Sequence, residues 1–148
     1  MSHKSPRIAK MIESLQGQSL PAHYLGYFEC FNRQQFYEAH DVLEELWLAE
    51  RKGPNYAFYK GLIQFAGAFV HLQRHSEKYP RLRPSAALFK LSRANLQEYP
   101  PVHEQLDLAE VLALIETWLE KLDAYGYQTN PLHTNQPPTL RLSIPPQT

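Results

Sequence analysis

Apolar and polar residues alternate with the helical period through most of the first 125 positions of the chain. A first amphipathic segment begins at Ser5-Pro6, where a capping residue precedes a proline, and it reaches Gly17. Pro21 opens a second segment, whose tyrosines and phenylalanines are too apolar to remain in water. Both segments therefore predict helices that pack one face on a core.

The third segment predicts a helix from Arg33 to about Arg51. Asn32 is expected to cap this helix, with Gln35 at the reciprocal position of a capping box. Glu38 falls on the polar side of the helical wheel, so we expect it to be solvated or to contact the preceding segment. The opposite arc is formed by Phe36, Ala39, His40, Val42, Leu43, Leu46 and Trp47.

The segment from Pro54 to about His75 is apolar around nearly its whole circumference, which is typical of a buried helix. We therefore expect it at the centre of the fold, surrounded by the other helices. A narrow stripe of small and polar residues interrupts the apolar surface and consists of Ala57, Lys60, Gly61, Gln64, Gly67, Ala68, His71 and His75. Small residues allow a second backbone to come close.

Two more helices are predicted before the C-terminal region. After a proline-bearing loop, Ser85 to Leu96 forms a helix with a modest apolar stripe of Ala87, Leu88, Leu91 and Ala94. The last helix begins with Asp107 as its cap and ends at Gly126. No segment predicts a strand convincingly, although residues 139–144 alternate weakly.

The pattern therefore predicts an all-α fold, a compact helical bundle. We place one helical domain at residues 1–126 and an extended, proline-rich tail at residues 127–148, because the tail has no periodicity. A length of 148 residues suits one domain rather than two.

Composition narrows the function classes. Fifteen basic and fifteen acidic side chains cancel, and the pI is about 7.1, which argues against a general nucleic-acid coat or a polybasic membrane anchor. Cys30 is the single cysteine, so an intramolecular disulfide and a thiolate zinc site are both excluded. No apolar run is long enough to span a membrane, and no signal peptide is visible. We expect a soluble, cytoplasmic protein.

One polar constellation stands out. His40 and Glu44 are four residues apart at the edge of the apolar arc, and Gln64, His71 and His75 follow one line along the central helix. We predict that the two sets face each other, because Gly61 and Ala68 remove the bulk that would hold the helices apart.

Three interpretations of this constellation remain open. The polar groups can form a buried hydrogen-bond network that fixes helix register, since unpaired buried groups are costly. They can hold a divalent metal such as zinc through His40, Glu44, His71 and His75. Alternatively, His40 and Glu44 can act as an acid–base pair beside a small pocket.

The motifs Phe31-Asn32, Glu38-Ala39-His40, Glu44, Trp47 and Gly61-Leu62-Ile63-Gln64, followed by His71, resemble the signature of the domain of unknown function 309 (DUF309) family. The resemblance runs from Phe31 to His71 and more loosely to Leu96. It implies a compact bundle around the central helix and a polar signature at Glu38, His40, Glu44, Gln64 and His71, without an established reaction. Family members usually continue with a short Gly-Asn turn, whereas residues 75–85 are longer here and contain prolines.

The sequence as a whole favours a small binding or interaction protein with an inward polar cluster. The alternative is a metal-dependent, hydrolytic enzyme that uses His40, Glu44 and His71. A second alternative is phosphate or RNA binding through the basic stretch of residues 74–93, although no nucleic-acid recognition module accompanies it. Self-association through the aromatic segment or the proline-rich tail is a further expectation.

Overall fold

The long helix α4 (Tyr56–Arg74) lies in the middle of the molecule in this computed structural model, which describes residues 5–143. The chain forms α1 (Pro6–Ser14), α2 (Ala22–Asn32), α3 (Phe36–Ala49), α4, α5 (Leu82–Leu96), β1 (Val102–His103), β2 (Leu106–Asp107), α6 (Leu108–Ala124) and the 3₁₀ helix η1 (Pro131–His133). The predicted all-α class and the central position of the fourth helix are confirmed.

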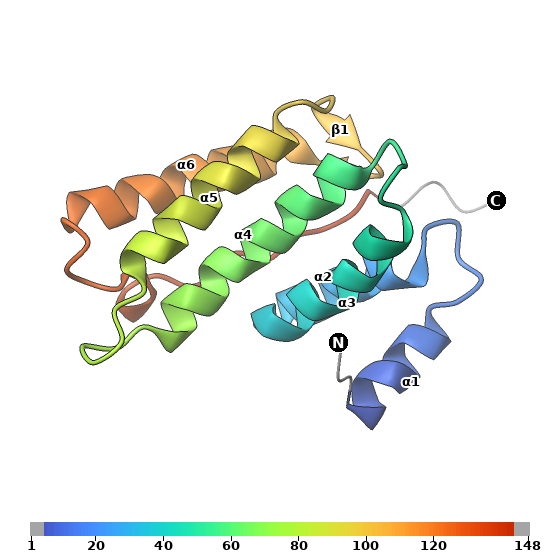
Figure 1. The fold of residues 1–148 in the computed structure, drawn as a ribbon, viewed down its shortest axis with the longest axis horizontal. Helices are drawn as coiled ribbons and strands as arrows, with labels where there is room; N and C mark the ends of the chain where they lie inside the picture. The colour runs from blue at the N-terminus through green and yellow to red at the C-terminus, as the bar shows by residue number, and fades with distance from the viewer. Residues whose placement is uncertain (1–4, 144–148) are drawn as a thin grey trace.

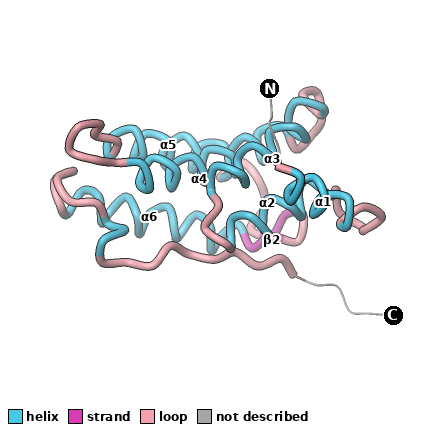
Figure 2. Tube along the Cα trace, turned by 90° about the horizontal axis from the view of Figure 1, so that it is seen from below, coloured by secondary structure: helices cyan, strands magenta, loops and turns pink. Residues whose placement is uncertain are grey.

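The helices form two layers. Figure 1 shows α4 between α3 and α5, and Figure 2, turned by 90°, shows these three helices above α2 and α6. α1 packs on α2 at one end of the molecule. This arrangement covers α4 on all sides except the outer surface of the upper layer.

Aromatic side chains fill the space between the two layers. Phe31 of α2 stacks on Phe65 of α4 with ring centroids 5.4 Å apart, and Phe69 of α4 meets Trp118 of α6 edge-on at 5.0 Å. The Tyr27 hydroxyl donates a hydrogen bond of 2.6 Å to the carbonyl oxygen of Leu62. The aromatic residues of the second segment therefore belong to the core, as their pattern predicts.

Several helix ends follow the sequence signals. The Ser5 side chain accepts a hydrogen bond from the Ile8 amide at 3.2 Å, and Asp107 accepts one from the Glu110 amide at 3.1 Å. Gly126 closes α6 with a φ of 59°, a left-handed conformation that glycine adopts without steric cost.

The predicted cap of the third helix is wrong. α2 continues to Asn32, and α3 begins only at Phe36. A tight turn therefore lies where the third helix was expected to begin, at Arg33. Gln35 is the N-cap residue of α3, but its side chain makes no capping hydrogen bond, and the Asn32 amide is engaged elsewhere. Its Nδ2 donates to the Leu140 carbonyl and its Oδ1 accepts from the Leu140 amide, each at 2.7 Å.

The predicted apolar stripe of α5 is also wrong. Leu91 is 51% exposed, and the buried face instead contains Ser85 and Ser92. Their hydroxyls donate to the α4 carbonyls of Ala68 and Gly61, at 2.9 and 2.7 Å, so these small polar residues allow the two backbones to approach. α5 also begins earlier than expected, because Pro84 is tolerated in its first turn.

A short hairpin was not predicted. β1 and β2 are only two residues each and are joined by Glu104 and Gln105, whose φ angles of 48° and 62° are those of a type I′ turn. This sequence lacks the usual glycine in such a turn, which is why the pattern did not reveal it. Among the described residues, no helix is long and apolar enough to cross a membrane.

The C-terminal tail lies on the lower layer, as Figure 2 shows. After η1 it is extended, and Leu140 is 2% exposed. The Asn130 side chain donates to the Leu72 carbonyl at 2.6 Å, and Leu142 forms a bridge with Leu106 of β2. Residues 1–4 of the predicted helical domain and 144–148 of the predicted tail, including Pro145-Pro146, lie outside the described residues.

Candidate functional site

A pocket of about 280 Å³ opens on the outer surface of the upper layer. We call it the α3–α4 pocket. Its wall combines cationic, imidazole, amide and apolar groups and is formed by Tyr37, His40, Ile63, Gln64, Gly67, Val70, His71, Arg74, Arg81 and Leu88. The structure thus brings His40 of α3 and Gln64 and His71 of α4 around one cavity.

Helical spacing explains how α4 contributes to this wall. Gln64, Gly67 and His71 are three and four residues apart, so they lie on the same face. Gly67 keeps the middle of that face open, because a Cβ there would lie 3.0 Å from the Leu88 Cδ1 atom. Gly61 and Ala68 do not face α3, as the sequence suggested, but lie under α5.

His40 lies at the rim of the pocket on the α3 side. Its Nε2 is 3.9 Å from a carboxylate oxygen of Glu44, and the two side chains are 29% and 38% exposed. The His40 ring also lies 5.7 Å from the Tyr37 ring. Its Nδ1 is buried and has no hydrogen-bond partner, whereas Glu44 is not part of the pocket wall.

Gln64 is fixed by a residue that the sequence did not single out. The Asn95 Nδ2 of α5 donates a hydrogen bond of 2.8 Å to the Gln64 Oε1. The Gln64 oxygen is therefore occupied, and its Nε2 makes no hydrogen bond within residues 5–143. Asn95 follows the buried Ser92 by three residues, a spacing that could have indicated its position.

His71 is held in its neutral form. Burial lowers the pKa of its imidazole, and the positive charges of Arg81 and then Arg74 lower it further. Its Nδ1 is buried without a hydrogen-bond partner. At neutral pH, the His71 ring therefore offers the pocket one N–H donor and one acceptor nitrogen.

Two arginines complete the pocket. The Arg74 guanidinium lies over the Tyr37 ring, 4.9 Å from its centroid, and the Arg81 Nε is buried without a hydrogen-bond partner. In the described part of the chain, neither arginine forms an ion pair, and no Asp or Glu lines the pocket. The sequence indicated a basic stretch here but not that two of its cations turn towards the histidines.

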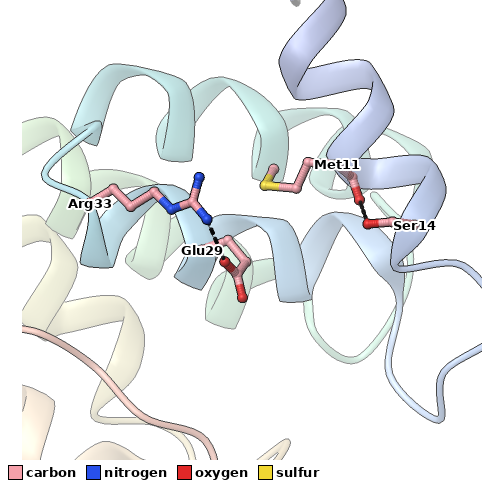
Figure 3. Close-up of polar contacts among 4 residues, drawn as sticks. All are labelled: Met11, Ser14, Glu29 and Arg33. Carbon is pink, nitrogen blue, oxygen red and sulfur yellow. Dashed lines mark hydrogen bonds and ion pairs between the residues drawn. The ribbon is translucent and has the colours of Figure 1, made fainter.

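Two other arginines form ion pairs with acids. A cavity between α1 and α2 contains Arg33, but Figure 3 shows that Glu29 of the same helix pairs with it, at 3.6 Å. Ser14 in that cavity donates to the Met11 carbonyl at 2.6 Å. Arg93 of α5 likewise pairs with Glu116 of α6. The unpaired arginines of the α3–α4 pocket differ from these.

The predicted metal ligands do not come together. Within residues 5–143, no group of three or more His, Cys, Asp or Glu side chains is placed to hold a metal ion. His75 lies outside the pocket wall, and its Nδ1 accepts a hydrogen bond of 2.9 Å from the Arg81 amide. The structure therefore does not bring His40, Glu44, His71 and His75 together around one point, because His75 ends α4 and fixes the following loop instead.

Glu38 lies away from the pocket. It is half-buried on α3, and its charge helps to raise the pKa of the Cys30 thiol of α2. Glu38 thus faces the preceding segment, one of the two expected outcomes. Tyr24, suggested as its partner, donates instead to the Glu104 carbonyl at 2.8 Å.

A second polar cluster escaped the sequence analysis. Asn55, just before α4, accepts a hydrogen bond of 2.7 Å from His103 Nε2 through its Oδ1, and its Nδ2 donates to a Glu104 carboxylate oxygen at 3.1 Å. These residues come together because β1 and β2 form a hairpin, which the sequence did not predict. Because the groups satisfy one another, we assign this cluster to holding the hairpin on the helices.

Comparison with known proteins agrees with the resemblance. No curated protein and no solved structure matches the chain. Residues 24–79 match the family model of the domain of unknown function DUF309, a range that spans α2, α3 and α4 and includes Tyr37, His40, Gln64, His71 and Arg74. Arg81, Leu88 and Asn95 lie beyond it. Over residues 24–79 the chain is therefore similar to the DUF309 family.

Proposed function

We propose that this protein is a small-molecule binding protein and that its ligand occupies the α3–α4 pocket. One observation carries the proposal: three buried polar atoms, His40 Nδ1, His71 Nδ1 and Arg81 Nε, have no hydrogen-bond partner, and all three belong to residues of this pocket wall. An unsatisfied buried polar group costs about 1–3 kcal/mol. These atoms have almost no exposed surface, so small side-chain shifts would bring them to a polar ligand, whose hydrogen bonds would offset that cost.

The same observation argues against a purely structural role for the cluster. A network that fixes helix register would pair its members with one another. Here the polar partner of Gln64 is Asn95 on α5, and Gln64, His40 and His71 make no hydrogen bond to each other. Apolar side chains of Ile63, Val70 and Leu88 stand beside the polar groups, a mixture that is typical of ligand pockets.

The pocket dimensions suit a small molecule. A cavity of about 280 Å³ is near the lower end of the usual range for ligand sites, roughly 300–1,000 Å³. RNA binding through residues 74–93 and an acid–base role for His40 and Glu44 remain predictions. So does self-association, although Tyr24, Tyr27 and Phe31 are fully buried within one chain and cannot supply an aromatic contact surface.

Filling the pocket tests the proposal. Val70→Phe adds a ring to the half-buried pocket wall, while Leu91→Phe adds one at an exposed position of α5 outside it. We expect fragments from a chemically diverse library to shift the side-chain NMR signals of His71 and Gln64 in the natural protein and in Leu91→Phe. Val70→Phe, with its fold verified by circular dichroism, should lose these shifts.

The opposite results would refute small-molecule binding at this site. These are a library in which no fragment moves the signals, or fragments that act equally on both phenylalanine variants. Gly67→Ala provides a milder obstruction, since the added methyl group contacts Leu88 and leaves most of the pocket open. It should weaken binding less than Val70→Phe does.

A further inference from the structure

We infer that the ligand of the α3–α4 pocket carries an oxyanion, a carboxylate or a phosphate group, on a small apolar body. This inference rests on the proposed function and deepens it by naming the chemical class of the ligand. It depends on the balance of charge, the kind of hydrogen-bonding atoms and the apolar part of the wall.

The charge in the pocket is not balanced by the protein. Two guanidinium groups, from Arg74 and Arg81, contribute to the wall, and no carboxylate does. Glu44 lies outside the wall, and its oxygen is 3.9 Å from His40. Because both arginines stay charged at all ordinary pH values, a bound anion would supply the missing counter-charge.

Two of the free polar groups of the pocket residues can only donate. The Arg81 Nε–H and the Gln64 Nε2 group can only donate, and the neutral His71 ring has one N–H. The Gln64 oxygen already accepts one hydrogen bond, from Asn95. A ligand rich in acceptor oxygens therefore fits these atoms better than an amine or an ammonium group.

The arginines are also suited to a planar or tetrahedral oxyanion. Stacking on the Tyr37 ring orients the Arg74 guanidinium, with the ring centroid at 4.9 Å. An oriented guanidinium binds carboxylate or phosphate oxygens through parallel N–H groups. Ile63, Val70 and Leu88 then provide the apolar surface for the rest of the ligand.

Four probes of similar shape separate the alternatives: benzoate, phenyl phosphate, benzyl alcohol and benzylamine. We expect benzoate, phenyl phosphate or both to bind in an NMR titration, with Kd rising as salt is added. The neutral and cationic probes should bind at least about 10-fold more weakly. The ratio between the two anions tells whether a carboxylate or a phosphate is preferred.

Arginine variants supply the controls. Arg81→Gln and Arg74→Gln should each raise the Kd of the anionic probe about 10-fold or more, because each removes a charged donor. Arg83→Gln removes one charge from the same stretch, but Arg83 stands over the Tyr127 ring and not in the pocket wall. It should leave the Kd within about 2-fold of the natural protein, since exposed charges are screened.

The outcomes separate this inference from the proposed function. If benzyl alcohol binds as tightly as benzoate, or if the arginine variants bind the anions unchanged, the anion assignment is wrong while small-molecule binding stands. If none of the four probes binds, the charge of the library fragments that do bind tests the anion assignment. Fragments that are neutral or cationic would show that this assignment is wrong. If the library also yields no ligand, both proposals fail together.

Discussion

The side chain of Cys30 is 1% exposed on α2, among the aromatic residues of the core. Burial raises the pKa of its thiol to about 11, and the negative charge of Glu38 acts in the same direction. Only the thiolate is nucleophilic, so the folded state suppresses the chemistry of this residue in two ways, by protonation and by lack of access.

We therefore predict that Cys30 reacts slowly with thiol reagents in the native protein. At pH 7.5, a pKa of about 11 leaves roughly 100-fold less thiolate than the ordinary pKa of 9.0 does. A colorimetric thiol assay should show a native rate at least about 100-fold below the rate in concentrated urea. Equal rates in the two conditions would contradict the burial of this residue, and Cys30→Ser should abolish both reactions.

At the residue scale, the position of a side chain was predicted correctly where it follows from helical spacing. His40, Gln64 and His71 reach one pocket because each sits on a predictable face of a long helix. Arg81 could not be placed in this way, because it lies in the turn before α5, where no periodicity applies. Its role depends on how the loop folds back onto α4.

At the scale of elements, α4 and α5 approach each other closely. Gly61 lies opposite Leu96, and the Ser92 hydroxyl bonds to the Gly61 carbonyl. A Cβ added at Gly61 would lie 2.7 Å from two atoms of the fully buried Leu96 side chain. The helices can therefore keep this spacing only while residue 61 has no side chain.

Gly61→Ala should consequently destabilise the protein, although alanine favours helices. We expect it to be about 1–3 kcal/mol less stable than Gly67→Ala, because overpacking a tight core costs that much. The second variant is a matched control: it makes the same change in the same helix, but meets the end of the half-buried Leu88 side chain at 3.0 Å. Urea unfolding of both variants gives the comparison, and equal midpoints would contradict the close contact.

The serines of α5 explain why the hydrophobic pattern predicted the wrong buried face for this helix. A hydrophobic pattern assigns Leu91 to the core and Ser85 and Ser92 to solvent. The structure reverses this assignment, because a serine can both fit a narrow helix contact and satisfy its hydroxyl on the neighbouring backbone. The stripe of small residues on α4 indicated a close helix neighbour correctly, but it could not tell which helix that neighbour would be.

For the molecule as a whole, the C-terminal tail ties together elements that are far apart in the sequence. Asn130 contacts α4, Leu140 is held by Asn32 of α2, and the Ser143 amide donates to the Gln105 carbonyl of the hairpin turn at 2.7 Å. Figure 1 shows the tail, in red, running behind α4 towards the hairpin end of the bundle. The tail closes the lower layer between α2 and α6.

Asn32→Ala should release this part of the tail. The variant loses both hydrogen bonds to the Leu140 backbone, each worth about 0.5–1.5 kcal/mol. In hydrogen exchange, the Leu140 amide should exchange about 10-fold faster or more, since its acceptor is the Asn32 side chain.

The control for this prediction is Asn135→Ala. Asn135 bonds to the Pro131 carbonyl and the Thr134 hydroxyl, both within the tail, so its loss does not detach the tail from α2. The Leu140 amide should remain protected in that variant. Unchanged exchange at Leu140 in Asn32→Ala would show that the Asn32 clamp does not hold the tail.

The sequence by itself determined the all-α class, the central helix, several helix ends and the shared face of Gln64 and His71, because these depend on local periodicity and capping. Only the tertiary structure decided which partners meet across long separations: Asn32 with the tail, the serines of α5 with α4, and Arg74 and Arg81 with the two histidines. These contacts join residues that are distant in the chain. The polar residues among them follow no local periodicity from which the contact could be predicted. Their arrangement follows from the packing of the whole molecule.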